Sequence, residues 1–147
     1  MAPFIVLASA FALLRLAGFA GVRALDEMAL PLRIAVASMF LLTASAHFAK
    51  RRADLVRMVP AWMPRPHLAV TLTGLLEIAG AVGILLPRVA PYAAVGLGLL
   101  LVAMFPANVH AARAKLTLDG RPVTPLPQRS AVQLVFLAAV LGAGLIG

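Results

Sequence analysis

Apolar residues gather in five long runs that short polar or basic connections separate. The runs cover residues 3–21, 30–48, 67–86, 90–110 and 130–147. A hydrocarbon core about 30 Å thick needs roughly 20 helical residues, with a range of about 17–25, and each run fits that range. Because a backbone in lipid must satisfy its own hydrogen bonds, we expect each run to be a helix. The pattern predicts an all-α polytopic transmembrane bundle, with four core helices and an N-terminal fifth, in a single domain over residues 1–147.

The first run could be mistaken for a secretory signal peptide. A signal peptide has a basic start, an uninterrupted apolar stretch and a small-residue cleavage site. Here no basic side chain precedes the run, and Arg15 interrupts it. We therefore expect this segment to be a retained helix.

Composition supports a membrane protein and excludes several other classes. Hydrophobic residues make up 63% of the chain and charged residues 12%. A soluble domain of this size could not bury so much apolar surface, and disordered chains are polar instead. The chain has no cysteine, which excludes disulfides, thiolate metal sites and cysteine nucleophiles. The lipid bilayer is therefore the expected environment.

The basic residues predict how the spans are oriented. The net charge is +8, but the charges lie between apolar runs rather than in one soluble patch, which disfavours nucleic acid as a partner. Nine of the 13 Lys and Arg residues fall in the second and fourth connections: Lys50, Arg51, Arg52, Arg57, Arg65, Arg113, Lys115, Arg121 and Arg129. The positive-inside rule places both connections in the cytoplasm, with the N-terminus inside and the C-terminus outside.

These two connections also have local patterns of their own. Residues 51–59 are basic and amphipathic enough for a short turn on the membrane surface, and Pro60, Pro64 and Pro66 end any helix there. In the fourth connection, Asp119-Gly120 lies between apolar residues, which favours a tight hairpin turn.

The run 67–86 carries an acid near its middle. At helical spacing, Glu77 shares a face with Thr73 and the small residues Gly74, Gly80 and Ala81, whereas leucines gather on the opposite face. We therefore expect Glu77 to point into the bundle. A carboxylate at this depth costs at least roughly 2.5–3.5 kcal/mol, so it needs a partner. Arg15 lies near the middle of its own span and is the expected counter-charge. The pair admits two interpretations, a functional acid or a structural ion pair.

The three histidines form a second pattern. His47, His67 and His110 all lie at span ends that the topology places on the cytoplasmic side. Thr43 shares a face with His47, and Asn108 lies close to His110 just after a proline. A polar ligand pocket is one interpretation. The other is that histidine merely tolerates the interface. The spacing gives little support to a haem, and we expect no metal site.

Several motifs together resemble the DoxX family of small bacterial membrane proteins. They are residues 40–48 (FLLTASAHF), 58–60 (MVP), 73–81 (TGLLEIAGA) and 105–111 (FPANVHA). The resemblance implies a compact bundle in the bacterial cytoplasmic membrane. Some relatives are linked with quinone-coupled sulfur oxidation or with complexes that handle oxidative stress. The family's common residues map to His47, Glu77, Asn108 and His110, with no agreed catalytic role. Thiol chemistry of relatives cannot apply to a chain without cysteine.

We therefore expect a small accessory membrane subunit that binds a quinone-like or lipid-like molecule for a redox or stress-response partner. Glu77, Thr73 and Arg15 would line the inner part of the site. Its polar mouth would consist of His47, Asn108 and His110. A quinone is the only cofactor that this interpretation names, and the chain is not expected to be a complete enzyme. A proton-coupled transporter of small solutes and a purely structural membrane protein are the alternatives, and association into homo-oligomers stays open.

Overall fold

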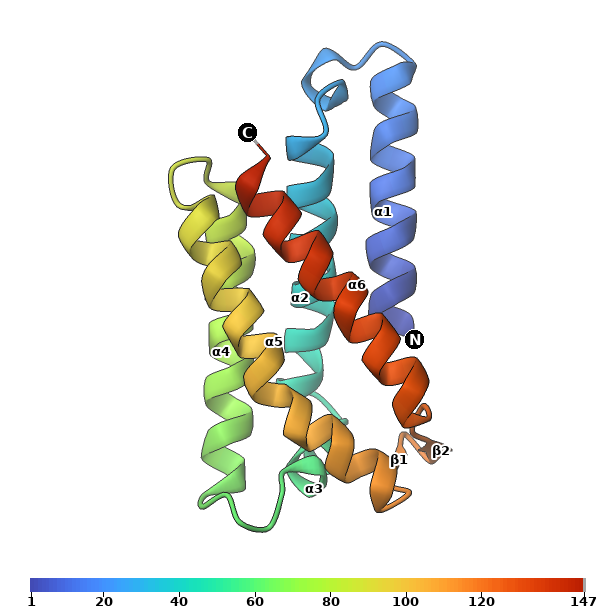
Figure 1. Cartoon of the computed structure of the whole chain (residues 1–147), viewed down its shortest axis with the longest axis vertical. Helices are drawn as coiled ribbons and strands as arrows, with labels where there is room; N and C mark the ends of the chain where they lie inside the picture. Colours follow the sequence, from blue (N-terminus) through green and yellow to red (C-terminus); the bar gives the residue numbers. More distant parts are fainter. Residues whose placement is uncertain (147) are drawn as a thin grey trace.

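The computed structural model describes residues 1–146 and is an all-α bundle, as the sequence predicts (Figure 1). Five helices of 18 to 24 residues are long and apolar enough to cross a membrane. In chain order the elements are α1 (Ala2–Phe19), the short 3₁₀ helix η1 (Arg23–Leu25), α2 (Ala29–Phe48), α3 (Arg52–Met58), α4 (Pro66–Leu85), α5 (Ala90–Arg113), β1 (Thr117–Leu118), β2 (Arg121–Pro122) and α6 (Leu126–Leu145).

The helix boundaries agree with the predicted spans except in the last two. Helix α5 continues through Pro106 and ends at Arg113, three residues beyond the predicted end. Helix α6 begins at Leu126, four residues before the predicted start, and Pro127 lies in its first turn. Proline suits that position because the first N–H groups of a helix have no partner within the helix. Gly147, the last residue of the predicted fifth span, lies outside the described residues.

Helix α2 lies at the centre and contacts α1, α4 and α6, while α5 packs against α4 and α6. The largest fully buried side chains include Phe40 and Met39 on α2, Ile84 on α4, Leu97 on α5 and Val140 on α6. Ile84, Leu97 and Val140 pack in the half of the bundle that contains the C-terminus and the α4–α5 turn, which we call the core end, whereas Met39 and Phe40 lie near the middle of α2. The opposite end, which carries α3 and the β1–β2 hairpin, is called the loop end (Figure 1).

The small face predicted for α4 is the face that packs. Gly74, Glu77 and Ala81 are buried, whereas Leu68, Leu72, Leu75 and Val82 are exposed on the outer side. At Gly74 an added Cβ would lie 2.7 Å from the Cβ of His47, which is closer than two carbon atoms can approach. The absence of a side chain at Gly74 therefore lets α4 lie directly against the last turn of α2.

Helix α6 crosses the bundle obliquely (Figure 1). Its C-terminal end is held by Arg33 of α2, whose Nε donates to the carbonyl of Ala143 at 2.9 Å and whose Nη2 donates to that of Ile146 at 3.3 Å. Arg33 is only 6% exposed, so its hydrogen bond to Ala143 forms inside the protein, whereas the bond to Ile146 lies nearer the surface. Because the attachment is at the core end, the first half of α6 diverges from α2 toward the loop end.

At the loop end, α3 and the hairpin are joined by charged groups. Arg51 Nε donates to Asp119 Oδ2 at 2.7 Å, and the backbone N–H of Asp119 donates to Asp54 Oδ2 at 2.9 Å. Arg57 pairs with Asp54 as well. Asp119 and Gly120 have φ angles of 54° and 71°, so the predicted tight turn is present and pairs Leu118 with Arg121. We call this set of contacts the latch.

Candidate functional site

A cavity of about 860 Å³ occupies the loop half of the bundle. Its walls come from α2, α4, α5 and the first half of α6, and the first turn of α1 completes one side. Helix α3 and the hairpin contribute Leu55, Met58 and residues 118–119 and 121–122 at the loop end. The divergence of α6 from α2 thus opens a space that the packed core end does not have.

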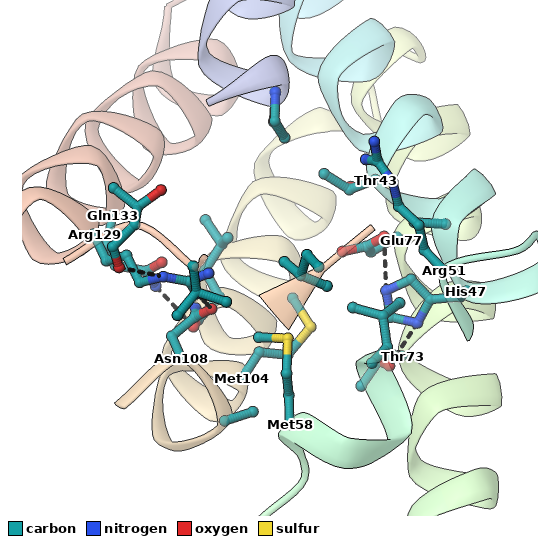
Figure 2. Close-up of a pocket in the computed structure, with 18 of the residues that line it drawn as sticks. Thr43, His47, Arg51, Met58, Thr73, Glu77, Met104, Asn108, Arg129 and Gln133 are labelled. Atoms are coloured by element: carbon teal, nitrogen blue, oxygen red, sulfur yellow. Dashed lines mark hydrogen bonds and ion pairs between the residues drawn. The ribbon is translucent and has the colours of Figure 1, made fainter. Parts of the chain in front are cut away.

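Glu77 is the most buried charged residue of the described chain, with 2% of its surface exposed. Its Oε2 lies 3.6 Å from the Nε2 of His47, and within the described residues this oxygen has no hydrogen-bond partner (Figure 2). Thr43, one turn before His47 on α2, also lines the cavity. Burying a polar atom without a hydrogen bond is costly, so this oxygen needs a partner that a molecule in the cavity could supply. Glu77 and His47 are called the acid–imidazole pair below.

The other side of the imidazole fixes its tautomer. His47 Nδ1 lies 2.7 Å from the carbonyl oxygen of Val70 and 3.2 Å from the Thr73 hydroxyl. A carbonyl oxygen only accepts hydrogen bonds, so Nδ1 must carry a proton. In a neutral imidazole, Nε2 is then an acceptor that faces Glu77. The acid–imidazole pair can therefore hold one proton between them and can offer either a donor or an acceptor to a third group.

A second polar group lies across the cavity. Arg129 at the start of α6 donates to the Oδ1 of Asn108 on α5, and Gln133, one turn later, donates to the carbonyl of Leu101 at 2.7 Å. Figure 2 shows this group on the side opposite the acid–imidazole pair, with Met58 and Met104 between them. Because the Asn108 oxygen accepts from Arg129, its amide NH₂ is left as a donor. Asn108, Arg129 and Gln133 are called the amide group.

Methionines supply much of the apolar wall. Five of the six methionines line the cavity: Met1, Met39, Met58, Met63 and Met104. A methionine side chain is unbranched and polarizable, so it adapts to different shapes and contacts aromatic rings favourably. The cavity thus combines two polar ends with an adaptable apolar middle.

Four of the six predicted site residues line this cavity, namely Glu77, His47, Thr73 and Asn108. Arg15 does not, and its predicted pairing with Glu77 is wrong. The Arg15 guanidinium donates to the carbonyl oxygens of Leu25 and Asp26, the first at 3.0 Å. The reason is a shift of α1 along the bundle. Its first turn lines the cavity, which leaves Arg15 about 16 Å farther along the helix at 1.5 Å per residue.

His110 was also predicted for the site, but it lies outside the cavity. It is half-buried near the end of α5. His67 is exposed, so the three histidines do not form a ring. Among residues 1–146 no group of three or more His, Cys, Asp or Glu side chains could hold a metal ion.

Arg129 and Gln133 are site residues that the sequence did not lead us to predict, although it contains a signal for them. The two residues are four positions apart and share one face of α6. A polar pair on one face of an apolar span points inward. Because the predicted span began at residue 130, Arg129 was assigned to the preceding connection, and its shared face with Gln133 was not recognised.

The fold and the site define a small bundle of five apolar helices with an internal cavity that has polar groups at two ends. Residues 36–142, more than half of the chain, match the family model described as domain of unknown function DUF8561, and the chain belongs to this family. No curated protein and no solved structure matches the chain. Helix α1 lies outside the matched residues.

Proposed function

We propose that this protein binds a quinone-like molecule in the cavity and serves a redox or stress-response partner as an accessory membrane subunit. The observation that carries the proposal is the unpartnered Oε2 of Glu77, buried 3.6 Å from His47 Nε2 at the wall of an apolar cavity. Such an oxygen needs a hydrogen-bonded partner. A quinol hydroxyl supplies a donor, and a quinone oxygen accepts from the pair when the pair holds a proton.

The second polar end favours a ring with oxygen atoms at opposite edges. The acid–imidazole pair can bind one edge, and the amide of Asn108, on the opposite side of the cavity, can donate to the other. Met58 and Met104 lie between these ends, where they can contact the ring. The volume of about 860 Å³ is within the range of about 300–1,000 Å³ usual for small-molecule sites. It leaves room for the first part of a hydrocarbon tail.

Membrane orientation is part of the proposal. The loop end carries most of the basic residues, so we place it in the cytoplasm of a bacterial cell, with the C-terminus outside. The resemblance to the DoxX family favours the same membrane and stays a prediction. Because the chain has no cysteine, Ala53→Cys on α3 and Arg88→Cys at the α4–α5 turn give single labelling sites. A membrane-impermeant maleimide should label only Arg88→Cys in intact spheroplasts. The reverse pattern would contradict the orientation.

The proposal is tested by extraction and titration. In the first experiment, small molecules are extracted from protein purified in a mild detergent and identified by mass spectrometry. In the second, a short-chain ubiquinone and a menaquinone analogue are titrated into delipidated protein. Glu77→Gln replaces the carboxylate with a neutral amide of the same shape. Hydrogen bonds to charged groups contribute about 1.5–3 kcal/mol, so we expect at least about tenfold weaker binding.

Glu27→Gln provides the matched control, because Glu27 is exposed in the α1–α2 connection and the chemical change is the same. This variant should bind as the wild type does. Wild-type protein that carries no quinone and binds neither probe would overturn the proposal.

The acid–imidazole pair also favours a second function, proton-coupled transport of a small solute. A buried carboxyl that can exchange a proton with an imidazole is what such coupling requires. Uptake into proteoliposomes that a pH gradient drives and that Glu77→Gln abolishes would support transport over quinone binding.

A further inference from the structure

The walls of the cavity differ in how firmly their elements are joined. Helix α2 packs along α4, and α5 packs along α6. Helix α1 packs against α2 and η1 but forms no extended contact with α6 within the described residues. Yet both α1 and α6 line the cavity, α1 with residues 1–4 and α6 with Arg129, Val132, Gln133 and Phe136. The boundary between these two helices is therefore formed by the cavity itself, and we call it the seam.

At the loop end, by contrast, charged contacts join the elements of the wall. The latch joins α3 to the hairpin through Arg51 and Asp119 and through Asp54 and the Asp119 backbone. Both elements contribute residues to the cavity wall, so the latch holds them across the side that faces the loops. These contacts hold α3 and the hairpin together at the water-exposed side of the cavity.

Apart from Arg129 and Gln133, which hydrogen-bond to α5, the side chains at the seam are apolar. Phe4, Val132 and Phe136 are half-buried, and Ala2 is exposed. The neighbouring residues Leu134 and Val135 of α6 are exposed, at 68% and 44%, on a helix apolar enough to span a membrane. Apolar side chains at this place suit hydrocarbon and would be costly at the mouth of an aqueous channel.

We propose that the cavity opens sideways into the bilayer through the seam between the first turn of α1 and the first half of α6. The inference rests on the proposed function and restricts its ligand to a molecule dissolved in the membrane. Such a ligand has an oxygen-bearing head that enters between the helices and a hydrocarbon tail that stays in the seam. A water-soluble metabolite does not fit this route.

Site-directed spin labelling tests the opening directly, because every engineered cysteine is unique in this chain. Labels are placed on the two sides of the seam in separate variants, Ala2→Cys and Val132→Cys. Leu134→Cys serves as the lipid-facing reference and Ala53→Cys, on α3, as the water-facing reference. Protein is reconstituted in phospholipid nanodiscs, and collision rates are measured with oxygen, which concentrates in hydrocarbon, and with a water-soluble nickel chelate.

For both seam labels we expect oxygen collision rates equal to that at Leu134→Cys. The nickel rates should fall on the order of tenfold below that at Ala53→Cys, because polar solutes are excluded from hydrocarbon. Nickel rates equal to the water-facing reference would show an aqueous entrance and overturn the inference. Low rates with both reagents would show a closed cavity and overturn it too. The measurement needs no ligand, so it can refute the lateral opening while titration still shows quinone binding. Equally, it can support the opening while titration shows no quinone binding.

Discussion

Arg33 and Glu77 are both charged and almost fully buried, but they lie in halves of the bundle that are built differently. At the core end the Arg33 guanidinium donates to two carbonyl oxygens at the C-terminal end of α6, where the helix dipole favours a positive charge. In the loop half, Glu77 Oε2 lies beside a cavity with no hydrogen bond from the described residues. Buried charges are tolerated when the protein satisfies them, so Arg33 has a structural role and Glu77 is available to a ligand.

The comparison predicts that removing the charge of Arg33 destabilises the bundle strongly. In Arg33→Met the carbonyls of Ala143 and Ile146 lose their donor. The Ala143 carbonyl is buried, and leaving such a group unsatisfied costs about 1–3 kcal/mol, whereas the exposed Ile146 can bond to water instead, so we expect a loss of about 2–3 kcal/mol. Thermal unfolding in detergent checks this. The matched control is Arg88→Met, which alters an exposed arginine in the α4–α5 turn and should leave the unfolding temperature unchanged. Equal unfolding temperatures for the two variants would contradict the structural role of Arg33.

A smaller loss of stability is expected at Gly74, where the α2–α4 contact positions the acid–imidazole pair. An added methyl group would lie 2.7 Å from His47 Cβ and 2.9 Å from Phe48 Cε2, so the helices must separate. Overpacking of this kind typically costs about 1–3 kcal/mol, and we expect quinone affinity to fall in Gly74→Ala as well.

Gly96→Ala is the control for the same chemical change in α5, because no described atom lies within 4 Å of the added Cβ. Alanine is a better helix former than glycine, so this variant should be unchanged or slightly more stable. A Gly74→Ala variant that unfolds and binds as Gly96→Ala does would show that the close approach is not needed.

The smallest effect is expected at the latch, which is exposed to water. The backbone N–H of Asp119, and next the Arg57 guanidinium, lower the pKa of Asp54 below its ordinary value of 3.8. A carboxyl with a lowered pKa stabilises the folded state above its ordinary pKa and loses that contribution as the pH falls through the folded value. Spin labels on α3 and the hairpin should therefore become more mobile only below about pH 4. Loss of the latch contacts between pH 5 and 7 would contradict this assignment.

The sequence was sufficient to predict the parts of the fold that follow from periodicity. Hydrophobic length gives the five spans, and 3.6-residue spacing turns Glu77, Thr73 and Gly74 to the packed face of α4. The Asp119-Gly120 pair predicts its turn because both positions need a positive φ. Periodicity assigns a residue to a face, and it says nothing about how far one helix is shifted along its neighbour.

Because periodicity does not give the shift of one helix along another, the pairing of Arg15 with Glu77 was predicted wrongly. The sequence predicts Arg15 and Glu77 near the middles of their spans, but Arg15 lies in the last third of α1, and α1 is displaced along the bundle (Figure 1). Similar position in the sequence is therefore not equal depth. The oblique path of α6 likewise follows from the distant contact between Arg33 and Ala143, which no local pattern encodes. This path creates the cavity and brings Arg129 and Gln133 to it, whereas His110 stays outside.

The most direct test measures quinone affinity and thermal stability together on Glu77→Gln. If the acid is kept for a ligand, affinity falls at least about tenfold while the unfolding temperature is unchanged or rises, since a buried carboxyl whose Oε2 has no hydrogen bond is replaced by a neutral amide. If Glu77 instead maintains the fold, the unfolding temperature falls by several degrees and the affinity of the remaining folded protein is unchanged. The second result would contradict the central claim that the protein leaves this carboxyl for a bound molecule.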